Sequence, residues 1–151
     1  MSQLKVENSI VIQAPIEKVC DALTKPEQTS KYMFGCETVS NWKPGNSLLW
    51  RGSNEGQEMV FAKGFIRQIE PYSLLQYTVI DPNATYPDIP ENYLNVTYRI
   101  ATENGHTILT VIQDGFEGAA EGEKRYIEVY NNGEGWNPIL VEIKKLLETI
   151  E

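Results

Sequence analysis

Histidine and cysteine are scarce in this chain of 151 residues, which has one histidine and two cysteines. His106 lies beside an expected hairpin turn, and Cys20 and Cys36 do not have the paired spacing of zinc ligands. A hydrolase of the Ser-His-Asp type would also need a Gly-x-Ser-x-Gly turn, which the sequence lacks. The sequence therefore predicts no metal site, no cofactor and no catalytic triad.

Basic residues are also few. The chain has 13 lysines and arginines against 21 aspartates and glutamates, so its formal net charge is −8. Proteins bind nucleic acids and anionic membranes largely through lysine and arginine side chains. We therefore expect neither a nucleic acid nor a membrane among the partners, and we interpret the net charge as a source of solubility.

Long apolar runs are missing as well. The longest unbroken run is Met59 to Ala62, whereas a membrane-spanning helix needs ~20 residues. Residues 1–7 do not show the basic-then-apolar pattern of a signal peptide. The sequence therefore predicts a cytoplasmic protein, and in a reducing cytoplasm its cysteines are not expected to form a disulfide.

Short elements separated by turn residues make up the chain, which we expect to form one domain over 1–151 because a chain of this length usually has a single core. Hydrophobic periodicity and turn signals define the elements. We expect a strand at 5–13, short helices beginning at Pro15 and Pro26, strands at 47–51, 59–69, 74–80, 93–101 and 107–113, and a long amphipathic helix over 126–150. This order predicts an α+β fold with helices on one face of an antiparallel sheet.

Several sequence motifs, in this order and spacing, resemble one known group of proteins. These motifs lie at 12–19, 22–27, 63–66, 70–78, 105–111 and 135–147. Together they resemble the START-like (SRPBCC) superfamily and, within it, the homologues of the activator of the heat-shock chaperone ATPase (AHSA-type domain). The resemblance implies a helix-grip fold, in which a curved antiparallel sheet wraps around a long C-terminal helix and encloses a cavity. It implies no shared set of catalytic residues.

Aromatic residues are the most informative group, with three tryptophans and eight tyrosines. Tyrosine and tryptophan combine a large apolar area with one polar group, which suits the wall of a small-molecule site. On the inward faces of the implied fold, the expected ligand-binding residues are Trp50, Tyr77, Tyr98, Gln113, Tyr130 and Trp136, with Tyr32, Met33 and Phe34 closing one end. The alternative interpretation is that these side chains simply fill the core.

Gln113 is the most specific of these candidates. Its amide falls on an otherwise apolar strand face, and burying an unpaired amide costs ~1–3 kcal/mol. It therefore needs a hydrogen-bond partner, which is a ligand, a water molecule or Tyr98. We expect the irregular loop over 81–92, which includes Tyr86, to close the cavity.

Three hypotheses for the function follow. The first is a binding protein that holds a small hydrophobic or amphipathic molecule between the sheet and the C-terminal helix. The second is a cofactor-free enzyme of the cyclase or hydrolase type in the same cavity, although no catalytic residue is identified. Its candidate acid–base groups are Glu70, Asp114, Glu117 and Glu128. The third is a chaperone-associated interaction domain, and the sequence also leaves a homodimer open.

Overall fold

The structure, a computed structural model, describes residues 4–33 and 35–148. The expected binding residue Phe34 lies outside the described residues. Helices and strands follow one another in the order β1 (Val6–Ile12), α1 (Ile16–Thr24), α2 (Pro26–Tyr32), β2 (Glu37–Val39), β3 (Ser47–Asn54), β4 (Gln57–Glu70), β5 (Leu74–Val79), η1 (Pro90–Asn92), β6 (Leu94–Glu103), β7 (His106–Asp114), α3 (Gly122–Tyr130), η2 (Asn131–Gly133) and α4 (Asn137–Glu148).

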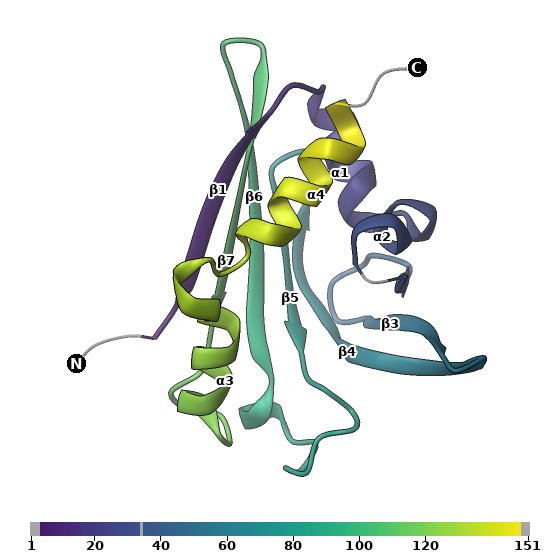
Figure 1. The fold of residues 1–151 in the computed structure, drawn as a ribbon, viewed down its shortest axis with the longest axis vertical. Coiled ribbons are helices and arrows are strands. Elements are labelled where there is room, and N and C mark those ends of the chain that lie inside the picture. Colours follow the sequence, from purple (N-terminus) through teal and green to yellow (C-terminus); the bar gives the residue numbers. More distant parts are fainter. Residues whose placement is uncertain (1–3, 34, 149–151) are drawn as a thin grey trace.

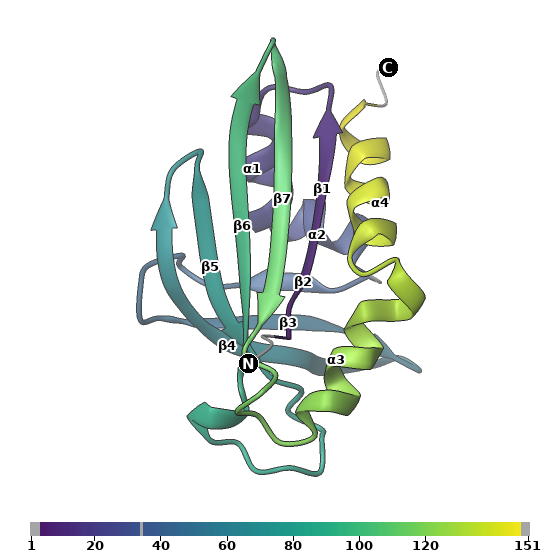
Figure 2. The same cartoon turned by 90° about the vertical axis from the view of Figure 1, so that its left-hand side faces the viewer.

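All the strands belong to one antiparallel sheet of seven, in the order β1-β7-β6-β5-β4-β3-β2. The sheet is strongly curved, so that β3 and β4 run across the direction of β6 and β7 (Figure 1). The helices α1, α2 and α4 all lie on the concave side (Figures 1 and 2). This arrangement is the helix-grip architecture, and it confirms the predicted fold class.

A close approach of β4 to β5 accompanies the curvature. A Cβ atom added at Gly64 would lie 1.6 Å from the carbonyl oxygen of Thr78, so only glycine fits there. A β-bulge interrupts the pairing of β3 with β4, because Trp50 pairs with Ala62 while Arg51 pairs with Val60. Phe61 is therefore the extra residue of the bulge, and bulges redirect side chains locally.

The elements match the sequence-based predictions closely, and the main differences lie at β2 and in the C-terminal helix. The helix α2 and the strands β1 and β3 to β7 are found where the patterns predicted them. Strand β2, an edge strand of three residues, was not predicted. The single long helix expected over 126–150 is wrong, because the structure has two helices there, α3 and α4, separated by a turn.

Backbone conformation explains the break between α3 and α4. Asn131 and Asn132 have φ values of 53° and 57°, in the left-handed region, which ends a right-handed helix. Gly135 has a φ of 52°, and a Cβ there would lie 2.4 Å from Oδ1 of Asn8 on β1. The same Asn8 oxygen accepts a hydrogen bond of 2.9 Å from the backbone N–H of Trp136. The turn thus fixes Trp136 at the start of α4.

The core lies between the sheet and the helices on its concave side. Ile12 of β1 and Leu140 and Ile143 of α4 are fully buried. Lys144 donates a hydrogen bond of 2.8 Å to the carbonyl oxygen of Val11, so α4 also covers the free edge of β1. In the described part of the chain, no helix is long and apolar enough to cross a membrane.

Candidate functional site

Two cavities of similar size lie along the concave face. On β5 and β6, the inward-facing residues alternate along each strand, and they contribute to both cavities. The first has a volume of about 260 Å³, and its lining includes Trp50, Phe61, Tyr77, Val96, Gln113 and Trp136. We call it the glutamine pocket. The second has a volume of about 270 Å³, and its lining includes Cys20, Leu23, Trp42, Tyr72, Leu75 and Ile100. We call it the cysteine pocket.

A buried hydrogen bond holds the polar wall of the glutamine pocket. The indole nitrogen Nε1 of Trp136 donates to Oε1 of Gln113 at 2.9 Å. Both residues are buried, and they come from the α3–α4 turn and from β7. The amide oxygen of Gln113 therefore bonds to Trp136, a partner that the sequence analysis did not consider. This bond joins the C-terminal helix to the sheet at the edge of the pocket.

A chain of aromatic rings forms the adjoining wall. The ring centroids of Trp50 and Tyr77 are 6.2 Å apart, those of Tyr77 and Tyr98 are 6.1 Å apart, and those of Tyr98 and Trp136 are 6.0 Å apart. These separations are typical of favourable aromatic pairs. The phenols of Tyr77 and Tyr98 lie close enough for each to influence the pKa of the other. The aromatic wall is therefore fixed by ring packing and, at Trp136, by the hydrogen bond to Gln113.

Burial keeps the phenols of this wall in their neutral form. It raises the pKa of Tyr98 to about 12, against the ordinary value of 10.0. Burial, together with the nearby Tyr98, also raises the pKa of Tyr77 well above its usual range. Burial raises the pKa of the Cys36 thiol, which lines the same pocket. At neutral pH these groups are therefore protonated and unsuited to act as general bases.

The structure brings together most, but not all, of the residues that the sequence singled out. Trp50, Tyr77, Gln113 and Trp136 line the glutamine pocket, and Tyr98 packs directly behind them. Tyr32 lies in the core, where its hydroxyl donates to the carbonyl oxygen of Ala22 at 2.7 Å.

Tyr130 does not face inward as expected. The residue is 47% exposed, and its ring stacks on that of Tyr126 with the ring centroids 5.7 Å apart. The physical reason is the break in the helix. Tyr130 was expected to face inward as part of the apolar stripe of one continuous helix, but α3 ends at Tyr130.

Phe61 is a pocket residue that the sequence reasoning missed. Strict alternation along β4 does not bring both Phe61 and Ala62 to one face, yet both line the glutamine pocket. The bulge opposite Trp50 accounts for this. No turn residue or change in periodicity marks the bulge in the sequence. Met33, which was expected to close one end of the cavity, does line the pocket. Cys36 was missed because it lies in irregular structure after α2.

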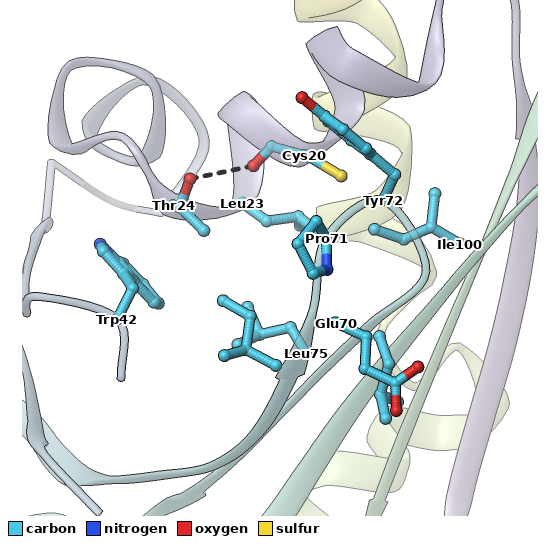
Figure 3. A pocket seen from close by; sticks show the side chains of 11 residues that line it. Cys20, Leu23, Thr24, Trp42, Glu70, Pro71, Tyr72, Leu75 and Ile100 are labelled. Atoms are coloured by element: carbon cyan, nitrogen blue, oxygen red, sulfur yellow. Dashed lines mark hydrogen bonds between the residues drawn. The ribbon is translucent and has the colours of Figure 1, made fainter. Parts of the chain in front are cut away.

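The cysteine pocket is built differently (Figure 3). Trp42 and Tyr72 lie on opposite sides of it, and their φ values of 60° and 65° are both in the left-handed region. For bulky residues this conformation is strained. Burial raises the pKa of the Cys20 thiol, opposed in part by a hydrogen bond from the Tyr72 backbone. Of the carboxylates considered, Glu70 lines this pocket.

The loop over 81–92 does not close either cavity of the concave face, contrary to expectation. None of its residues lines them, and Asp88 and Pro90 instead border a hollow that includes Phe65 and Tyr93. The guanidinium of Arg125 lies 4.4 Å above the Tyr86 ring and donates to the carbonyl oxygen of Asn92 at 2.9 Å. The loop is thus tied to α3 instead of covering a cavity.

Fold and site together define a START-like protein with a helix-grip fold. The sequence model of the family described as "Activator of Hsp90 ATPase homolog 1-like protein" matches residues 13–148. The chain therefore belongs to this family. The family resemblance inferred from the sequence motifs is confirmed.

Solved structures support the same fold. The solution structure of ChR145 from Cytophaga hutchinsonii is 36% identical, with a TM-score of 0.75 over 98% of this chain and 97% of that chain. Protein NE0264 from Nitrosomonas europaea is 16% identical, with a TM-score of 0.73 over 98% and 96%. DynU16, a putative protein of the dynemicin biosynthetic locus, is 17% identical, with a TM-score of 0.72 over 98% of this chain and 48% of that chain. The search of curated proteins found no match.

Proposed function

We propose that the protein binds a small, largely apolar molecule in the glutamine pocket. The observation that carries the proposal is a cavity of about 260 Å³ whose single amide is held in a fixed position by Trp136. Small-molecule sites typically combine such an apolar lining with a few well-placed polar groups. Membership of the family supports a ligand-binding domain in general terms.

Binding accounts for the pocket better than catalysis does. The described residues that line it include no carboxylate, histidine, lysine or arginine. The phenol of Tyr77 and the thiol of Cys36 have raised pKa values and remain protonated at neutral pH. General acid–base catalysis needs a group that titrates near the working pH. The pocket therefore offers shape and one hydrogen-bonding amide, but no acid–base pair.

The free thiols of Cys20 and Cys36 fit a reducing compartment, and we propose a cytoplasmic location on that ground. A chaperone partner remains the competing proposal, because it is the function in the family's name. The two functions differ in what they require of the glutamine pocket. Ligand binding requires the pocket to be accessible, whereas a chaperone partner does not.

Native mass spectrometry of the freshly purified protein, compared with a variant whose pocket is filled, tests the proposal. Ala62 lines the pocket on β4, whereas Ala101 is exposed on β6, so Ala62→Phe and Ala101→Phe form a matched pair. We expect a species heavier than 17.1 kDa for the wild type and for Ala101→Phe, and the bare chain for Ala62→Phe.

Loading with a probe covers the case in which the native ligand is lost during purification. Benzophenone at 100 times its Kd should raise the free energy of unfolding of the wild type by ~2.7 kcal/mol. It should leave Ala62→Phe unchanged. Two results would contradict binding in this pocket. In the first, benzophenone stabilises Ala62→Phe as much as Ala101→Phe. In the second, it stabilises none of the three proteins.

A further inference from the structure

The Gln113 amide uses only one of its two ends within the protein. Its Oε1 accepts the hydrogen bond from Trp136, while its Nε2 has no hydrogen-bond partner among the described residues. Gln113 as a whole is only 6% exposed. No described buried side-chain nitrogen or oxygen is sealed away without a partner, so Nε2 is open to one of the two spaces that Gln113 lines. These are the glutamine pocket and a surface hollow beside Val129 and Ile139. The nearly buried Gln113 therefore has an unused donor that borders open space.

The chemistry of tryptophan fixes which end of the amide is unused. An indole N–H is a donor only, whereas a glutamine amide has one accepting oxygen and one donating NH₂ group. Reversing the amide would bring two donors together, so Trp136 forces Oε1 toward itself. The free NH₂ group of Gln113 therefore has two N–H bonds to donate, which favours an accepting atom on the ligand.

The remaining lining sets the other requirements for a ligand. The described lining of the glutamine pocket carries no cationic side chain, and the chain as a whole has a net charge of −8. Burying a carboxylate without a cation is strongly unfavourable. The aromatic wall formed by Trp50 and Tyr77 favours an apolar body. A neutral ligand with one accepting oxygen satisfies all these conditions.

We propose that the ligand of the glutamine pocket is a neutral, largely apolar molecule with a carbonyl oxygen that accepts a hydrogen bond from Nε2 of Gln113. The inference rests on the proposed function of the pocket and adds the chemical class of the ligand. Gln113 is then a specificity-determining residue, and Trp136 is a positioning residue that acts through it.

Three probes of nearly equal shape test the ligand class. Diphenylmethane has no polar group, benzophenone adds a carbonyl oxygen, and benzhydrol adds a hydroxyl that is both donor and acceptor. Isothermal titration gives the Kd of each. We expect the wild type to bind benzophenone about fivefold to tenfold more tightly than diphenylmethane, which is the net effect of one hydrogen bond. We also expect the side-chain NH₂ resonances of Gln113 to shift on binding benzophenone.

Variants assign the preference to Gln113. Gln113→Met keeps the length of the side chain and removes the donor, so the ratio of the two Kd values should fall to about one. Gln76→Met is the matched control, because Gln76 bonds to Thr97 and lines neither concave-face cavity. If Gln113→Met fails to fold because Trp136 has lost its acceptor, the double variant Gln113→Met/Trp136→Phe removes both partners and serves instead.

The outcomes separate this inference from the proposed function. A benzophenone preference that disappears with Gln113 supports both. Equal Kd values for all three probes in the wild type would overturn the carbonyl assignment and leave the pocket as a binding site. That result would place the free N–H toward the surface hollow that Gln113 and Trp136 also border. Failure of all three probes to bind would contradict both proposals.

Discussion

The two cavities of the concave face are nearly equal in volume but are built in opposite ways. The glutamine pocket, of about 260 Å³, is bounded mainly by buried side chains of β5, β6, β7 and the α3–α4 turn, among them the hydrogen-bonded pair Gln113 and Trp136, and by Phe61, which is 37% exposed. The cysteine pocket, of about 270 Å³, is bounded by Trp42 and Tyr72, both in left-handed conformations. Tyr72 is also 52% exposed.

This difference indicates which cavity is already shaped for a ligand. Binding is stronger when the site does not have to be ordered at the moment of association. The Gln113–Trp136 hydrogen bond and ring packing fix most of the wall of the glutamine pocket before any ligand arrives. The wall of the cysteine pocket includes Tyr72, which is more exposed than Phe61, the most exposed described residue that lines the glutamine pocket. We therefore assign ligand binding to the glutamine pocket.

The largest difference in stability is expected between variants of two tyrosines, Tyr98 beside the glutamine pocket and Tyr72 in the cysteine pocket. Tyr98→Ala removes a ring that is 1% exposed, so the free energy of unfolding should fall by ~3–5 kcal/mol. Tyr72→Gly removes an exposed ring and a left-handed strain, so it should leave stability unchanged or raise it by about 1 kcal/mol. Urea denaturation measures both changes. Equal losses would show that the two walls do not differ in rigidity.

Alkaline pH should weaken the glutamine pocket through Tyr98. Its pKa is raised to about 12 in the folded protein, against 10.0 ordinarily, so the unfolded chain loses this proton first. Stability therefore falls as the pH rises from 10 to 12, and Tyr98 accounts for about 2 kcal/mol of that fall. In urea titrations at both pH values, Tyr98→Phe should show a correspondingly smaller fall. An unchanged fall would contradict the burial of this phenol.

Loss of the indole donor should have a moderate effect. Trp136→Phe leaves Oε1 of Gln113 without its partner, and we expect a loss of about 1–2 kcal/mol. Trp42→Phe in the cysteine pocket is the matched control, because Nε1 of Trp42 has no hydrogen-bond partner among the residues described. Thermal or urea unfolding of both variants should show the larger loss for Trp136→Phe. The reverse order would show that the bond to Gln113 contributes little.

The smallest effect concerns the two thiols. Cys36 lines the glutamine pocket and Cys20 lines the cysteine pocket. Benzophenone at its Kd occupies half of the protein, so the alkylation rate of Cys36 should fall about twofold while that of Cys20 stays the same. Peptide mass spectrometry after treatment with iodoacetamide measures both rates. Protection of Cys20 alone would move the binding site to the other cavity.

Local patterns predicted most of the fold. Alternation and turn residues located β6 and β7, and Pro26 marked the start of α2. The break after Tyr130 was missed because its cause is tertiary, since Gly135 and Trp136 are held against Asn8 of a strand more than 100 residues away. Strand β2 was missed because three residues give no usable period.

The candidate site was also predicted only in part, because local patterns locate some of its residues and tertiary structure places the others. Inward strand positions such as Tyr77, Gln113 and Trp50 follow from alternation along a strand, and all three line the pocket. Phe61 depends on a bulge, which alternation does not reveal. Tyr130 was misplaced because one helix was assumed where there are two. The partner of Gln113 was left open because Trp136 reaches it only through the folded turn.

The three indole N–H groups provide the most direct test of the central claim. Trp50 and Trp136 line the glutamine pocket, and Trp42 lines the cysteine pocket, so each cavity has its own reporter. A ¹H–¹⁵N spectrum of the protein titrated with benzophenone resolves all three signals. The account predicts that the Trp50 and Trp136 resonances shift together while Trp42 stays in place. A shift of Trp42 alone, or of none of the three, would contradict binding in the glutamine pocket.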